Sequence, residues 1–350
     1  MSVVDKSKKV FKSREFVIIC IILFIGTLMS FAQETFFTMS NMMTIAMGLC
    51  ADGFVVIGCA LILIAGEIDL SVGSVQCLAS VLVGAFYSRG VNIWIAAILA
   101  ILLCSCMGCI TGGIISKLGG ASSAFIITLG MQGAIRGLCY IITKGTSITV
   151  VGDGLASFKF LGGGYIGSIL PTFFVLVMVA IAISHYLLRN TKFCAKTYFI
   201  GSNVNAAELA GIKVKKMRVF LYMISAMTAA IAGVLCTARF GVSSPILGQG
   251  ADGRAITAAV IGGTSMSGGE GGILGAFFGL ILVQLISNSL IQMNVSVYWQ
   301  DFISNMLLIT VIVVDALSRN SSRRKLSGYV SYMHDMFTNK KVSGAEKGKV

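Results

Sequence analysis

Charged residues, histidines and prolines are all scarce in this 350-residue chain. Charged residues make up 12% of it, about half of the roughly 25% that is typical of soluble domains, so an ordinary soluble protein is excluded. The two histidines, His185 and His334, lie far apart, which argues against a Ser/His/Asp catalytic set. Of the two prolines, Pro171 opens the apolar part of the run at 165–188 and Pro245 lies in a loop, so neither interrupts a long apolar stretch.

The chain also lacks the Gly-x4-Gly-Lys-Ser/Thr loop that cradles nucleotide phosphates, so it cannot bind and hydrolyse ATP through that loop. Two glycine patterns, 162–167 and 248–253, match a dinucleotide fingerprint, but neither lies in an alternating strand–helix unit. The ten cysteines are interpreted as small apolar residues, with no histidine beside them to complete a zinc site. We therefore expect no enzyme activity, cofactor or metal site.

Long apolar stretches dominate what the sequence does contain. A membrane-spanning helix needs about 20 apolar residues, and most of the runs reach that length, whereas 255–267 is short and is interpreted as a half-helix. We predict an all-α polytopic membrane protein with about ten transmembrane helices. The ten apolar runs are 16–32, 40–65, 70–88, 91–116, 123–142, 165–188, 217–238, 255–267, 272–293 and 298–317.

The net charge of +13 is distributed as expected for a membrane protein rather than for a nucleic-acid-binding protein. In a ten-span arrangement, 21 of the 27 basic residues fall on one side, which the positive-inside rule makes cytoplasmic. We expect a cytoplasmic N-terminus at 1–15, a transmembrane domain at 16–317 with a cytoplasmic loop at 189–217, and a cytoplasmic basic tail at 318–350. The first apolar run, which ends at Ser30-Phe31-Ala32, resembles a signal peptide but is interpreted as an uncleaved span.

The octet Gly66–Gly73 (GEIDLSVG) places two carboxylates inside membrane-grade sequence. Each costs roughly 2.5–3.5 kcal/mol on insertion scales unless it is compensated. Glycines at both ends and Ser71 near the middle predict a helix break, which is tolerated at this depth when it is buried in protein or lines a polar cavity. We expect Glu67, Asp69 and Ser71 to contribute to a translocation path, with a purely structural cap as the alternative for Asp69.

A second predicted break lies at 262–272, where six glycines occur in eleven residues. Each glycine in a helix costs about 1 kcal/mol relative to alanine, so a regular helix is not expected there. One break in each half of a chain is typical of transport sites built from repeats. Its hydroxyl-bearing residues Thr264, Ser265 and Ser267 are assigned to the same path.

The centre of the 189–217 loop predicts a helix of about two turns that starts at Ser202 or Asn203 and stops at Gly211. Such a helix is too short to be stable alone in water, so it must dock on something. Its partner is either this protein's own membrane surface or a groove on a separate cytoplasmic protein. The residues assigned to this contact are Asn205, Ala207, Glu208, Leu209 and Gly211.

Several segments together resemble the membrane subunits of bacterial ABC importers for monosaccharides, the ribose-type permeases. The matching segments are GEIDLSVGS at 66–74, GSNVNAAELAGIKV at 201–214, AAVIGGTSMSGGEGG at 258–272 and VIVVD at 311–315. Permeases for branched-chain amino acids are similar, but they typically carry Asn and a His-Gly pair where this chain has Asp69 and Val72-Gly73. The chain departs from the ribose type at Glu67, where glycine is usual, and at 251–254, where ADGR replaces a Glu-Leu pair.

The resemblance implies a permease subunit in the bacterial inner membrane. It also implies a second permease as homodimer or heterodimer, a cytoplasmic ABC ATPase subunit and an extracytoplasmic sugar-binding protein. The substrate would be a monosaccharide or related polyol. An ion-coupled secondary transporter, motivated by Glu67 and Asp69, and an ABC permease for nucleosides or branched-chain amino acids remain alternatives.

Overall fold

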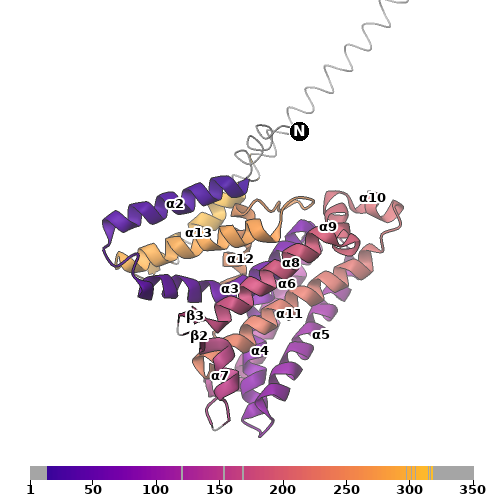
Figure 1. Ribbon diagram of the computed structural model, residues 1–350. Helices are drawn as coiled ribbons and strands as arrows, with labels where there is room; N and C mark the ends of the chain where they lie inside the picture. Colours follow the sequence, from indigo (N-terminus) through magenta and orange to yellow (C-terminus); the bar gives the residue numbers. More distant parts are fainter. Residues whose placement is uncertain are drawn as a thin grey trace, which may run out of the picture. The chain divides into compact units, whose positions relative to one another are not determined.

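A computed structural model of the chain describes residues 14–317 apart from 120, 153, 168, 297, 301, 304, 314 and 316. The tail 318–350 and all but the last two residues of the segment 1–15 therefore lie outside the described residues. The chain divides into one compact unit that ends at Leu308 and another that begins at Ile309. The first unit contains every labelled helix and strand (Figure 1).

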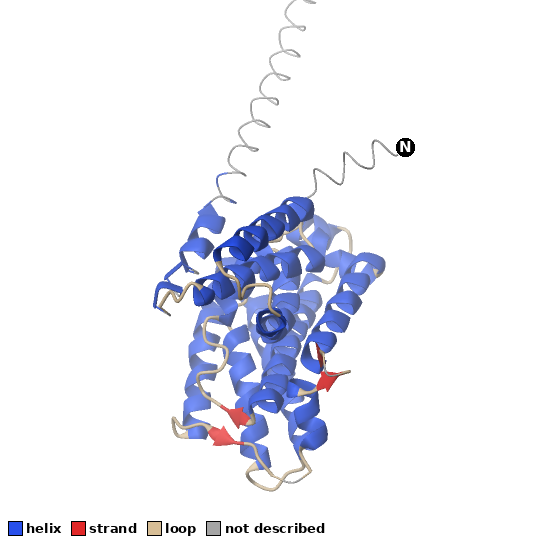
Figure 2. Ribbon diagram, turned by 60° about the vertical axis from the view of Figure 1, so that its left-hand side comes forward, coloured by secondary structure: helices blue, strands red, loops and turns tan. Residues whose placement is uncertain are grey.

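Among the described residues of the first unit, helices predominate and the strands form two short pairs (Figure 2). The longer helices are α2 (Arg14–Ala32), α3 (Met39–Ile64), α4 (Val72–Tyr87), α5 (Ile93–Leu118), α6 (Ala121–Thr143), α8 (Thr172–Asn190), α11 (Val214–Phe240) and α13 (Ile273–Gln292). The shorter helices are α7 (Ala156–Gly163), α9 (Lys192–Ser202), α10 (Val204–Leu209) and α12 (Ala251–Ile261). The antiparallel pairs join β1 (Ile148–Thr149) to β4 (Val242–Ser243) and β2 (Tyr165–Ile166) to β3 (Leu170–Pro171).

The prediction of an all-α polytopic protein is confirmed by the length and composition of these helices. Among the described residues, six helices are long and apolar enough to cross a membrane: α3, α5, most of α6, α8, α11 and α13. Three shorter apolar helices cover Phe16–Ala32, Val72–Tyr87 and Tyr298–Val313. The number of crossings, expected to be about ten, stays a prediction.

Local sequence explains where several helices begin. The side chains of Thr38, Asn92 and Thr191 each accept a hydrogen bond from the backbone of the following first turn, as N-cap residues do. Pro171 is expected to open the helix of the run at 165–188, and α8 begins directly after it, at Thr172. Residues 165–166 and 170–171 form the β2–β3 pair ahead of this helix, and Pro171 favours that boundary because proline fixes its own φ and disfavours helix in the residue before it.

Helix α11 is central to the core and packs along α3, α4 and α5. Small residues permit these close approaches: a Cβ added at Gly108 of α5 would lie 2.4 Å from the Tyr222 carbonyl oxygen, and one at Gly233 would lie 2.1 Å from the Gln76 carbonyl oxygen. Real Cβ atoms cannot approach backbone so closely, so glycine is required at both contacts. The polar residues on the first turns of α11 are thereby fixed against the end of α3 and the start of α4.

Candidate functional site: two interhelical connections, a loop helix and a polar pocket

The connection between α3 and α4, residues 65–71, is held along one face of α11. Arg218 of α11 forms a buried ion pair with Glu67, Tyr222 donates a hydrogen bond to the Ile68 carbonyl oxygen at 3.3 Å, and Ser225 donates one to Asp69 at 2.9 Å. Positions 218, 222 and 225 are four and three residues apart, the spacing that brings side chains to one helix face. Three consecutive turns of α11 therefore fix the extended path of this connection.

Asp69 is also held locally, by its neighbour Ser71. Its Oδ1 accepts hydrogen bonds from the Ser71 backbone amide at 3.0 Å and from the Ser71 hydroxyl at 2.6 Å. Both Glu67 and Asp69 are buried, with 3% of their surface exposed. A buried carboxylate is tolerated when it is paired or hydrogen-bonded, so the contacts with α11 and Ser71 account for two carboxylates in an apolar chain.

The connection between α12 and α13, residues 262–272, turns back on itself. The Ser265 amide donates to the Glu270 carbonyl oxygen at 3.1 Å, and the Gly268 amide donates to the Ser265 carbonyl oxygen at 3.1 Å. Thr264 and Ser265 are buried, whereas Ser267 is exposed at the tip. The three hydroxyl residues assigned to a path therefore do not share one environment.

The two connections meet each other and helix α9 at four glycines, which we call the glycine junction: Gly66, Gly201, Gly268 and Gly269. The Gly269 amide donates to the Ile64 carbonyl oxygen at 2.8 Å. A Cβ added at Gly268 would lie 2.6 Å from the Gly66 Cα and 2.7 Å from the Gly201 Cα. Three backbone segments that are distant in sequence thus touch with no side chain between them.

Tyr198 adds a directional bond between α9 and the second connection. Its hydroxyl donates to the Gly271 carbonyl oxygen at 2.9 Å. Burial raises the pKa of the Tyr198 phenol above its ordinary value, against the opposing effect of Arg189, so the hydroxyl keeps the proton that this bond requires. Helix α9 is therefore bonded, as well as packed, to the 262–272 connection.

Helix α10 follows α9 directly and presents a single large apolar side chain outward. Asn203 caps it, accepting from the Ala206 amide at 3.0 Å, and Gly211 beyond its end has a φ of 81°. Leu209 is 91% exposed, whereas Ala207 is buried in a cluster with Ile200 and Val214. The assigned residues thus divide: Asn205, Glu208, Leu209 and Gly211 are exposed, and Ala207 packs on its own chain.

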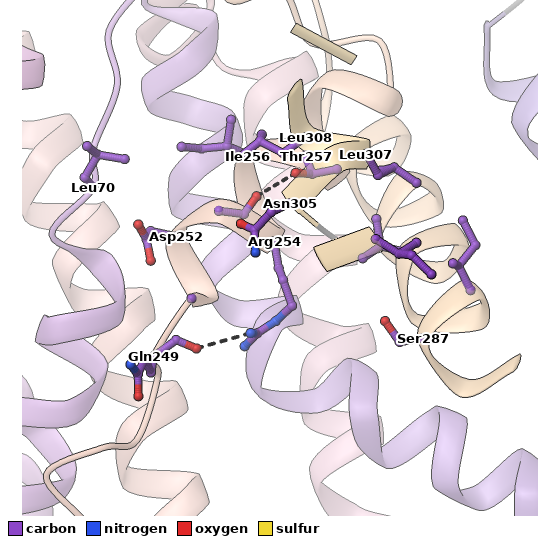
Figure 3. Close-up of a pocket in the computed structure, with 15 residues that line it drawn as sticks. Leu70, Gln249, Asp252, Arg254, Ile256, Thr257, Ser287, Asn305, Leu307 and Leu308 are labelled. Carbon is purple, nitrogen blue, oxygen red and sulfur yellow. Dashed lines mark hydrogen bonds between the residues drawn. The ribbon is translucent and has the colours of Figure 1, made fainter. Parts of the chain in front are cut away.

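A pocket of about 540 Å³ lies beside the N-terminal half of α12, between it, α13 and the residues Ile303, Asn305, Leu307 and Leu308. Figure 3 shows Arg254 reaching toward the Gln249 carbonyl oxygen, which it contacts at 3.2 Å. The same guanidinium pairs with Asp52 of α3 through bonds of 2.7 and 3.2 Å. The polar residues that line the pocket are Gln249, Asp252, Arg254, Thr257, Ser287 and Asn305.

The two segments predicted to form the path contribute one residue to the lining of this pocket, Leu70 from the 65–71 connection. Sequence reasoning missed Asp52 and Arg254 as partners, although one signal was present. Asp52 is the only charged residue in the apolar run 40–65, and an unexplained charge in such a run implies a partner elsewhere. Within the described part of the chain, no group of three or more His, Cys, Asp or Glu residues could hold a metal ion.

Comparison with known proteins matches residues 41–312 to the family described as the branched-chain amino acid transport system permease component. The chain is 32% identical over 288 residues to the ribose import permease protein RbsC of Bacillus subtilis, which covers 82% of this chain and 88% of that protein. RbsC of Escherichia coli K12 is 30% identical over 289 residues, covering 82% and 89%.

A third relative is the autoinducer 2 import system permease protein LsrC of Photorhabdus luminescens, which is 28% identical over 312 residues, covering 89% of this chain and 92% of that protein. No solved structure matches the chain. The family match spans most of the chain and includes both connections, the loop helices and the residues around the polar pocket. The chain therefore belongs to the branched-chain amino acid transport system permease family and is a membrane transport subunit of the ribose-permease type.

Proposed function

We propose that this chain forms the translocation path of an ATP-driven importer for a monosaccharide or related polyol. An extracytoplasmic binding protein would deliver the substrate, a separate cytoplasmic ABC subunit would hydrolyse ATP, and a second permease chain would complete the membrane part. The names of the relatives support a sugar-like substrate. The basic residues of 189–218 support a cytoplasmic position for α9 and α10 and for both termini.

The observation that carries the proposal is the glycine junction, because it joins an exposed loop helix to both connections. A force applied to Leu209 would move α10 and α9 together, since the two helices are consecutive and in contact. Helix α9 would pass that movement to Gly66 and Gly268 through backbone contacts, which cannot deform as side chains can. In this proposal the two connections act as paired helix breaks near the path.

In this proposal the predicted path residues have different roles. Glu67, Asp69 and Ser71 shape the first break by fixing it to α11, and Thr264, Ser265 and Ser267 shape the second. The polar pocket provides the surface on which a polyhydroxyl substrate could exchange hydrogen bonds with water for bonds with protein. Its volume lies within the roughly 300–1,000 Å³ range of small-molecule sites.

Replacing Leu209 with glutamate tests the link to an ATPase. A large apolar side chain that is 91% exposed would be buried in the partner, and a carboxylate there would lose that contact and add a desolvation cost. We expect ATPase co-purification to fall by roughly tenfold or more, as loss of an interfacial anchor of about 1.4 kcal/mol requires. Leu209→Met, which keeps apolar volume, should co-purify normally. Undiminished co-purification of Leu209→Glu would place the ATPase contact elsewhere.

Replacing Arg254 tests whether the pocket charges act on the substrate. We expect Arg254→Gln to reduce uptake into proteoliposomes by about tenfold or more, because it removes a pocket donor and leaves Asp52 buried without its partner. The double variant Asp52→Asn/Arg254→Gln removes both charges and serves as the control. If the double variant transports normally, the pair is structural and the pocket charges play no part in transport.

ATP-driven uptake separates this proposal from an ion-coupled secondary transporter. We expect transport by the permease, reconstituted with its ATPase and binding protein, to continue when proton and sodium gradients are collapsed. Transport that follows the ion gradients and ignores ATP would overturn the proposal.

A further inference from the structure

A second depression in the surface lies on the loop side of α11, away from the polar pocket. It has a volume of about 350 Å³ and is formed by α9, the connection after α10 and the first turn of α11. Its lining combines three basic residues, Lys196, Lys213 and Lys216, with three apolar ones, Phe193, Ile212 and Met217. We call it the lysine groove.

The charges around the lysine groove are not neutralised within the described part of the chain. The two ion pairs among the described residues are Glu67–Arg218 and Asp52–Arg254. Neither includes a lysine of the groove. Lys196 is placed with its amino group 5.7 Å from the centre of the Phe193 ring, a favourable contact that leaves its charge intact. Three ammonium groups beside one depression repel one another, so an anion placed among them would be stabilised.

The groove also lies where lipid headgroups are expected. Lys213 is the N-cap residue of α11, a 27-residue helix apolar enough to cross a membrane, and Lys216 is in its first turn. Helix α9 exposes Phe193 and Phe199, which are 45% and 62% exposed. Exposed aromatic and basic side chains at the end of a span are typical of the membrane–water interface.

We propose that the lysine groove binds the headgroup of an anionic phospholipid. The three lysines would surround the phosphate, and Phe193, Ile212 and Met217 would contact the glycerol and the first methylene groups of the chains. This combination of charge and apolar lining favours a lipid over an acidic protein segment. A lipid would contact the lysines through its phosphate and the apolar side chains through its methylene groups, whereas an acidic segment would leave the apolar side chains without contacts. The site is independent of the sugar path and does not rest on the proposed transport function.

The test is a lipid titration of the purified full-length chain in uncharged detergent, followed by native mass spectrometry. Phosphatidylglycerol and phosphatidylcholine with identical acyl chains are compared, with inorganic phosphate as a competitor. The groove variant is Lys196→Gln/Lys213→Gln/Lys216→Gln. Its matched control is Lys117→Gln/Lys192→Gln/Lys215→Gln, which removes the same charge from exposed lysines of the same predicted membrane face that do not line the groove.

We expect the tightest phosphatidylglycerol site to weaken by roughly a hundredfold in the groove variant, because each lysine near an anionic lipid contributes about a fivefold factor. The control variant, and the charge-preserving variant Lys196→Arg/Lys213→Arg/Lys216→Arg, should bind nearly as the parent does. Equal weakening in groove and control variants would overturn the proposal, as would equal binding of the two lipids. Displacement by phosphate alone would assign a free-anion site instead. Unchanged lipid binding with loss of ATPase co-purification would assign the groove to the ATPase.

Discussion

Replacing Arg218 with methionine should destabilise the membrane domain by roughly 3–5 kcal/mol, the usual cost of leaving one member of a buried ion pair without its partner. Glu67 is 3% exposed and Arg218 is buried at the start of α11. The methionine would keep much of the side-chain volume and remove only the charge and its hydrogen bond. The measurement is equilibrium unfolding of the purified protein in mixed micelles, followed by tryptophan fluorescence.

The double variant Glu67→Gln/Arg218→Met is the control, because it removes both charges. We expect it to recover most of the stability lost in the single variant, since replacing a whole buried pair is often close to neutral. Tyr222 and Ser225 would still hold the connection through Ile68 and Asp69. A single variant as stable as the parent would show that the pair does not anchor the 65–71 connection.

This ion pair also shows what could be predicted from the sequence. The bond between Asp69 and Ser71 joins residues two positions apart, so local chemistry was enough to predict it. The short helix at 255–267 was expected from its length, and α12 ends at Ile261. Glu67 and Arg218, however, are 151 residues apart in the sequence. The residues around Glu67 therefore do not indicate which helix supplies its partner.

Ala207 is a second residue whose contacts could not be predicted from the local sequence. A six-residue helix has too few positions for its pattern to show which face is buried, so Ala207 and Leu209 were both assigned to a partner. In the structure Ala207 is buried within its own chain, because it packs in an apolar cluster with Ile200, Val214 and Met217. Ala207→Trp would therefore disrupt the permease itself, and Leu209 is the residue that reports on a partner.

The glycine junction was not predictable because it depends on three backbone segments meeting. Glycines in both connections and at position 201 were visible in the sequence, but their separation gives no sign of contact. What unites them is the absence of a side chain at each closest approach. Contacts of this kind transmit displacement because no rotamer change can absorb it.

Gly201→Ala is therefore expected to uncouple the loop from the path. The added Cβ would lie 1.9 Å from the Ile64 carbonyl oxygen and 2.4 Å from the Gly269 nitrogen, both backbone atoms that cannot rotate away. Helix α9 must shift outward, with an overpacking cost of about 1–3 kcal/mol. Leu209 remains exposed, so ATPase should still co-purify, while sugar uptake falls by about tenfold or more because the two connections no longer follow the loop.

Gly113→Ala is the matched control, since Gly113 is also helical and no atom lies within 4 Å of its added Cβ. It should leave uptake, co-purification and the elution volume of the purified protein unchanged. Comparing elution volumes also separates uncoupling from misfolding in Gly201→Ala. Normal uptake by a well-folded Gly201→Ala permease would show that the junction is only a packing contact, and that the loop reaches the path through α11 alone.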